Sequence, residues 1–142
     1  MTTSASMSTV VRRRDAALLA RRYARAQCAG HTPPTLVEDV ELVVSELVAN
    51  AVRHGAGTIT LVLALLPDGV RVAVADQGPG APTLVDAGLE RTDGRGLALV
   101  DRLAAEWGVD RLPDGGKEVW CVVSAAAPDV PVRAGEPVPA PA

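Results

Sequence analysis

The most informative part of the chain is residues 41–54, which read ELVVSELVANAVRH. Apolar side chains recur there every three or four positions, the spacing that lines one face of an α-helix. The stretch ends on Arg53 and His54 before Gly55, and basic residues followed by glycine are typical of a helix end. The sequence therefore predicts a strong amphipathic helix, whose apolar stripe is Val40, Val43, Val44, Leu47, Val48 and Ala51.

Three polar residues lie on a second face of this predicted helix. Glu46 and Asn50 are four positions apart and Arg53 follows about one turn later, so their side chains share a face. Asn is a poor helix former because its amide competes for backbone hydrogen bonds, so an interior Asn suggests a specific role. Its carbonyl oxygen suits Mg²⁺, which shares oxygen ligands with substrate phosphates. Taken alone, such a pair is more often solvated surface, and only the other motifs favour a metal.

A second motif, Asp76-Gln77-Gly78-Pro79-Gly80, follows an aliphatic run at residues 70–75. The run predicts a β-strand, so the carboxylate of Asp76 emerges at a strand end into a glycine-rich loop. A carboxylate only accepts hydrogen bonds, which suits an exocyclic amine such as N6 of adenine. Gly78 and Gly80 lack side chains and let a flat base or a second backbone segment approach closely. The alternative for this stretch alone is an ordinary turn rich in Asp and Gly.

A third motif, Gly94-Arg95-Gly96-Leu97, precedes an apolar helix pattern. Free backbone N–H groups and the positive end of the helix dipole favour a phosphate at such a position. Arg95 adds a forked, delocalised charge for phosphate oxygens, and Arg91 is near enough in sequence to assist. A glycine-softened helix start is the alternative for this motif alone. Because the three motifs occur in order, together they predict a site for ATP and Mg²⁺.

The remaining pattern predicts one domain over residues 10–124. Residues 1–9 are expected to form a flexible N-terminus, and 125–142 a disordered tail rich in Pro and Ala. Thr35 and Glu38 have the spacing of a capping box at the start of the second helix. The order of elements predicts an α/β (α+β) fold, a two-layer sandwich with helices packed on one face of a mostly antiparallel mixed sheet. Its expected helices are 11–29, 35–54 and 96–107, its strands 58–66, 70–75, 109–112 and 118–123, and its lid-like loop 81–93.

Composition and charge exclude several classes of function. The 142 residues carry a net charge of −3 and lack the clustered Lys and Arg that binding to a nucleic-acid backbone requires. No apolar run reaches the roughly eighteen residues of a membrane span. Cys28 and Cys121 stand far apart without a CxxC pattern or a neighbouring ligand His, so neither a zinc site nor a disulfide framework is expected. We therefore expect a cytoplasmic protein without direct contact to nucleic acid or membrane.

The three motifs resemble the ATPase-like ATP-binding domain, of Bergerat or GHKL type, that histidine kinases, gyrase B, Hsp90 and MutL share. Glu46 and Asn50 match the N box of that family, residues 76–80 its first glycine box, and residues 94–97 its second. The match runs from about residue 11 to residue 123. Residues 41–54 are particularly similar to the small stand-alone branch of anti-sigma-factor serine/threonine kinases.

The resemblance implies a Bergerat-type sandwich with ATP bound between the helix layer and a lid. In such a site Asn50 holds Mg²⁺, Asp76 reads adenine, and Glu46 is the general base that deprotonates a Ser or Thr hydroxyl. The implied partners are a sigma factor or an anti-anti-sigma (antagonist) protein, and the implied process is transcription regulation. A homodimer is one of the oligomeric states that the resemblance leaves open. Two rival functions remain: a non-catalytic module that binds a partner only with ATP, and an ATP hydrolase in which Glu46 activates water.

The sequence departs from the family pattern at three places, one of which is the short loop between the two glycine boxes, which leaves a small lid. The last strand of the family usually carries a Thr where this chain has Glu118, after Gly115-Gly116-Lys117. The departure puts one polar contact on the adenine side in doubt. The strand that commonly precedes the first helix is not evident in residues 8–11.

Overall fold

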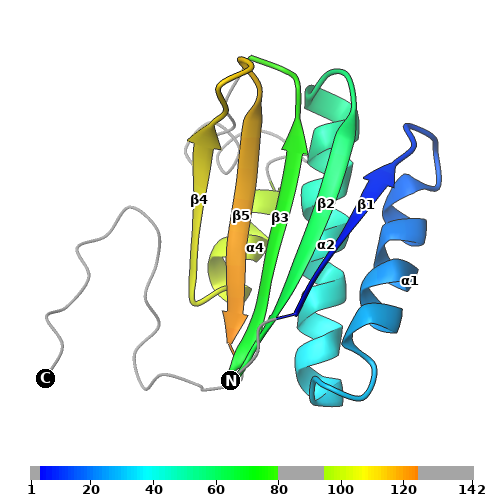
Figure 1. Cartoon of the computed structure of the whole chain (residues 1–142), viewed down its shortest axis with the longest axis vertical. Helices are drawn as coiled ribbons and strands as arrows, with labels where there is room; N and C mark the ends of the chain where they lie inside the picture. Colours follow the sequence, from blue (N-terminus) through cyan, green and yellow to red (C-terminus); the bar gives the residue numbers. More distant parts are fainter. Residues whose placement is uncertain (1–3, 80–94, 125–142) are drawn as a thin grey trace, which may run out of the picture.

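The computed structural model describes residues 4–79 and 95–124, and the expected loop over 81–93 lies outside them. In the described part, five strands form one sheet in the order β1-β2-β3-β5-β4 (Figure 1), and every pairing is antiparallel. The elements in chain order are β1 (Ser4–Val10), α1 (Ala16–Cys28), α2 (Pro34–His54), β2 (Ile59–Leu66), β3 (Gly69–Asp76), α4 (Arg95–Leu103), β4 (Glu106–Arg111) and β5 (Lys117–Ser124).

The helices cover one face of the sheet, so the described part of the chain has two layers (Figure 1). Side chains alternate between the two faces along β2 and β5, and over most of their length every second residue is buried. These buried residues join the apolar face of α2 in one hydrophobic core. Burial of apolar surface is the main favourable term in folding, so this core stabilises the layer contact. The predicted sandwich of helices on an antiparallel sheet is confirmed.

Helix α2 follows the predicted apolar stripe, and every member of the stripe is buried. The predicted capping box of Thr35 and Glu38 is wrong, because the N-cap is Pro33 and no side chain caps the helix. Pro34 is the first helical residue. Proline suits this position, since its fixed φ matches the first turn and its missing N–H would have no partner there.

Residues 4–10 form a strand that the sequence did not predict. β1 pairs with β2 over its whole length, from Ser4 opposite Leu65 to Val10 opposite Ile59, and it is an edge strand of the sheet. The expected flexible N-terminus is therefore wrong for this segment. Small polar residues have a weak preference for strands. The aliphatic strand β2 would otherwise leave the backbone N–H and C=O groups of one edge unpaired, and pairing with β1 satisfies them.

Helix α1 begins at Ala16 rather than at the expected Val11. The side chain of Arg12 explains the later start, because it donates to the carbonyls of Gly57 at 2.9 Å and Val52 at 3.0 Å. These bonds hold the segment between β1 and α1 against the end of α2. The face of α1 that packs on α2 carries small residues four apart, which lets the two helices approach closely. Its buried members are Ala16, Ala20, Ala24 and Cys28.

Helix α4 ends at Leu103, and the helix expected to run on to Trp107 is wrong at this end. Trp107 lies in β4, and its Nε1 donates to Oδ1 of Asp101 at 2.9 Å. Gly108 follows it and lies against the ring of Trp120, where a Cβ would come within 2.9 Å of the ring. Within the described residues, no helix combines the length and the apolar character that crossing a membrane requires.

Candidate functional site

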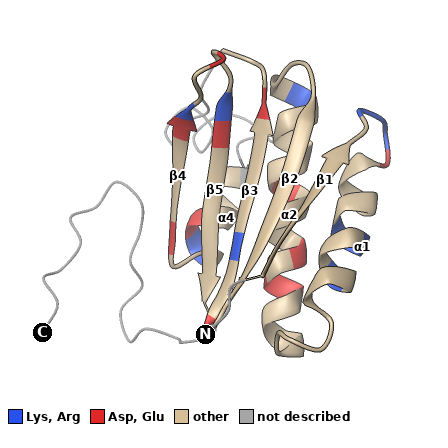
Figure 2. Ribbon diagram, viewed as in Figure 1, with Lys and Arg blue, Asp and Glu red and all other residues tan. Residues whose placement is uncertain are grey.

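Three elements meet at one end of the sheet, where β3 ends and β5 begins, and we call this place the Asp76 edge. In Figure 1 the end of α2, the end of β3 and the start of β5 lie at the upper edge, and Figure 2 shows both signs of charge on the strands there. The pairing of β3 with β5 places Asp76 directly opposite Lys117. The loop after α2 reaches the same point, because the N–H of Gln77 donates to the carbonyl of Ala56 at 2.8 Å. The end of α2 and the Asp76 motif are therefore neighbours in space.

Asp76 lies at the predicted strand end, but only 4 % of its surface is exposed. Its Oδ1 accepts hydrogen bonds from the N–H of Gly78 at 2.7 Å, the N–H of Ala56 at 3.4 Å and Nζ of Lys117 at 3.0 Å. A buried carboxylate needs such partners, because leaving its charge unpaired costs several kcal/mol. The single oxygen therefore ties together β5, the loop after α2 and the turn after β3.

Lys117 is the residue beside Asp76 that the sequence motifs did not single out. It forms an ion pair with Asp76, and the two side chains are 5 % and 3 % exposed. Glu118, expected on the adenine side, faces the other side of the sheet, where Arg71 lies 3.6 Å away. Neighbouring residues on a strand point to opposite faces, so the register that brings Lys117 to Asp76 turns Glu118 away. Counting back in steps of two from buried Val119 would have found Lys117.

Two glycines let the backbone approach the carboxylate of Asp76. A Cβ at Gly55 would lie 2.5 Å from Cγ of Asp76, and a Cβ at Gly78 would lie 3.0 Å from Oδ1. The second backbone segment that comes close to Gly78 is the loop after α2, whose Ala56 nitrogen would be 3.1 Å from that Cβ. Arg111 of β4 donates to the carbonyl of Pro79 and holds the turn from the other side. The carboxylate is thus fixed in position by several segments.

The N-box residues lie on a face of α2 that is only partly buried. Glu46 and Asn50 are half-buried, and Arg53 is exposed. The same helix packs against α1, α4 and the sheet. Asn50 precedes Gly55 by five residues, which is about 7.5 Å along a helix axis. Since Gly55 touches the carboxylate of Asp76, the structure brings the end of this polar face and the Asp76 motif to the same edge of the molecule.

The third motif is described only in part. Helix α4 begins at Arg95 and packs against α2, so the start of this helix belongs to the same layer as the N-box residues. Leu97 is 1 % exposed and is part of the hydrophobic core. Gly80, Arg91, Gly94 and the side chain of Arg95 lie outside the described residues.

The amide oxygen of Asn50 suits a metal that is shared with a ligand. Among residues 4–79 and 95–124, no three His, Cys, Asp or Glu side chains cluster so that they could hold a metal ion by themselves. Mg²⁺ usually keeps several waters and takes one or two protein ligands beside substrate phosphates. An amide oxygen on a half-buried helix face fits that pattern.

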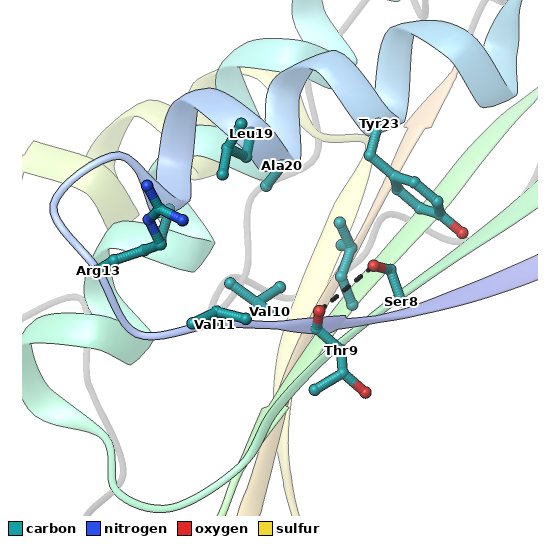
Figure 3. Close-up of a pocket in the computed structure, with 10 residues that line it drawn as sticks. Ser8, Thr9, Val10, Val11, Arg13, Leu19, Ala20 and Tyr23 are labelled. Atoms are coloured by element: carbon teal, nitrogen blue, oxygen red, sulfur yellow. Dashed lines mark hydrogen bonds between the residues drawn. The ribbon is translucent and has the colours of Figure 1, made fainter.

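A pocket of about 140 Å³ lies elsewhere, between β1 and α1 (Figure 3). Val10, Leu19 and Tyr23 line it, and the hydroxyl of Ser8 donates to the carbonyl of Thr9 at 3.5 Å. Its volume is below the roughly 300–1,000 Å³ of typical small-molecule sites. None of its lining residues belongs to the three motifs, so we place the candidate nucleotide site at the Asp76 edge.

Comparison with known proteins identifies the family. Residues 9–123 match the model of the histidine kinase-like ATPase domain, and the chain belongs to this family. An uncharacterized protein of Streptomyces coelicolor is 41 % identical over 75 residues, which are 49 % of this chain and 71 % of the relative. Membership in a family of ATPase domains assigns the chain to the nucleotide-binding proteins.

Two solved structures share the fold. The RsbU and RsbW domains of a Mycobacterium tuberculosis protein match with a TM-score of 0.65 and 25 % identity, covering 88 % of this chain and 33 % of that protein chain. The histidine kinase domain of a blue-light activated histidine kinase from Erythrobacter litoralis matches with a TM-score of 0.51 and 23 % identity, covering 75 % and 63 %. The chain thus spans less than two thirds of either neighbour. The predicted GHKL-type fold is confirmed.

Proposed function

We propose that the chain is an ATP-binding regulatory protein that transfers the γ-phosphoryl group of ATP to a Ser or Thr hydroxyl of an antagonist protein. The observation that carries the proposal is the fixed, buried carboxylate of Asp76 at the edge where the polar face of α2 ends. The similarity to a structure that contains an RsbW domain supports a regulatory role over a metabolic one. The expected partners are a sigma factor or an anti-anti-sigma protein.

Each end of the nucleotide has a proposed partner in this site. Asp76 accepts a hydrogen bond from the exocyclic amine of adenine, because its carboxylate offers only acceptors. The start of α4, with Arg95 and Arg91, binds the phosphates through backbone N–H groups and guanidinium charge. Asn50 contributes an amide oxygen to Mg²⁺. Neutralising phosphate charge is the chemistry that the bound ion supplies.

Glu46 is the proposed general base. Its carboxylate takes the proton of the acceptor hydroxyl, the hydroxyl oxygen bonds to the γ-phosphorus, and the bond from that phosphorus to the bridging oxygen breaks as ADP leaves. Phosphoryl transfer depends mainly on positioning and charge stabilisation, so the step needs only one proton acceptor from the protein, and a base on a rigid helix can supply it. Glu46 is half-buried on α2, so part of the residue is exposed on the helix that would present it to a partner hydroxyl.

The Glu46→Gln variant tests this proposal. It keeps the size of the side chain but removes the base, so we expect intact Mg-ATP binding and a loss of transfer by about 10²–10⁴-fold. The assay follows labelled γ-phosphate on a candidate antagonist protein, with phosphate release measured in its absence. Glu38→Gln is the matched control, because Glu38 is exposed at the start of the same helix.

Two outcomes would replace the kinase assignment. Phosphate release that needs Glu46 but no protein acceptor identifies an ATP hydrolase. A wild-type chain that neither transfers nor releases phosphate, yet holds a partner only with ATP, identifies a non-catalytic binding module.

A further inference from the structure

The ion pair of Asp76 and Lys117 has unused hydrogen-bonding capacity. A lysine ammonium has three donors, and among the described residues Nζ of Lys117 donates only to Oδ1 of Asp76, at 3.0 Å. All three hydrogen bonds that described residues donate to the carboxylate fall on that same oxygen. Oδ2 of Asp76 accepts none from residues 4–79 and 95–124. Within the described part of the chain, the pair therefore offers donors beside an acceptor oxygen that have no protein partner.

Burial makes these unused groups significant. Both side chains are at least 95 % buried, yet Oδ2 of Asp76 is not among the fully buried atoms that lack a partner. A ligand that offers a donor next to an acceptor would satisfy both groups at once.

Adenine has that pattern, since its exocyclic amine donates and the ring nitrogens N1 and N7 on either side of it accept. We propose that Lys117 is a second base-reading residue, whose ammonium donates to N1 or N7 while Oδ2 of Asp76 accepts from the exocyclic amine. The inference rests on the proposed ATP site and adds a specificity-determining contact to it. It also explains why a lysine stands on the buried face of β5, beside Asp76.

The test couples a change in the protein to a change in the base. Calorimetry would measure the affinity of the wild type and of Lys117→Met for ATP, 1-deaza-ATP and 7-deaza-ATP. In these two analogues N1 or N7 is replaced by carbon. We expect one analogue to bind the wild type about 10- to 100-fold more weakly than ATP, the range of one charged hydrogen bond. On Lys117→Met, ATP and that analogue should bind equally, because the contact is already lost.

The outcomes separate this inference from the proposed function. A wild type that binds no ATP, or prefers GTP, contradicts the ATP site itself. A wild type that binds ATP and both analogues equally overturns only the role of Lys117. An analogue penalty of the same size on wild type and Lys117→Met also overturns it, since the contact would then come from another residue.

Folding of the variant is controlled in two ways. Lys117→Arg keeps a buried cation, so this variant should retain the penalty of the same analogue at least in part. The wild-type comparison of the two analogues needs no variant, and it decides against the inference on its own if neither analogue is penalised.

Discussion

The charge balance of the site depends on two side chains, Asp76 and Lys117. Their ion pair is buried, and the carboxylate is also bonded to the backbone at Gly78 and Ala56. Removing one member of a buried pair leaves the other charged and without a partner, which is more costly than removing both. Substitution of Asp76 therefore tests folding as well as nucleotide binding, and base analogues separate the two effects.

Asp76→Asn should lower the free energy of unfolding by about 3–5 kcal/mol in the absence of nucleotide, the range for breaking a buried ion pair. The double variant Asp76→Asn with Lys117→Met should lose less, because no buried charge remains. Urea unfolding measures both. Glu118→Gln is the control, since its pair with Arg71 at 3.6 Å is more exposed and should be worth about 1 kcal/mol or less. A double variant no more stable than Asp76→Asn would contradict this account.

Cys121 should not react with thiol reagents in the folded protein. Burial raises the pKa of its thiol from 9.0 to about 12, and the thiolate is the reactive form. The folded state holds the proton to a higher pH than the unfolded state, so the contribution to stability is complete below pH 9 and is lost as pH rises toward 12. Labelling with a disulfide reagent at pH 8, with and without urea, measures this. Equal rates in both would show that Cys121 is accessible in the folded state.

Among the helices and strands, those with strong local patterns could be predicted and those that depend on a neighbour could not. The stripe of α2 and the aliphatic runs of β2 and β3 identify these elements from the sequence. β1 has no comparable pattern. It is stabilised by its pairing with β2, which its own sequence does not reveal. The ion pair of Lys117 with Asp76 was not predicted for a related reason, since it depends on the register of β5 against β3. Trp107 was assigned to a helix because its spacing continues that of α4.

Deleting residues 1–10 should lower the melting temperature by several degrees. The deletion unpairs one edge of β2 and removes Val10, which packs against the core. Deleting 128–142 is the control and should leave the melting temperature nearly unchanged, because this proline-rich segment has few large apolar groups to bury. Calorimetric melting of both shortened chains measures the difference. Equal losses in the two deletions would contradict the structural role of β1.

Across the molecule as a whole, one layer of helices on an antiparallel sheet brings motifs far apart in the sequence to one edge. α2 supplies Glu46 and Asn50, β3 supplies Asp76 and β5 supplies Lys117. The family match over residues 9–123 covers α2 and β3 completely and β5 except its last residue, Ser124. The order of helix and strand patterns was enough to predict this layering, and the nucleotide site that the three motifs indicate stays a prediction. The ion pair within the site became visible only in three dimensions.

The most direct test of the central claim is the affinity of the wild-type chain for Mg-ATP compared with Mg-ITP, measured by calorimetry. The two nucleotides differ in the base, where inosine has a carbonyl in place of the exocyclic amine and carries a hydrogen on N1. A carboxylate at Asp76 accepts from an amine and repels a carbonyl, so ATP should bind at least about 10-fold more tightly. Equal affinities, or no binding of ATP, would contradict the assignment of this edge as an adenine nucleotide site.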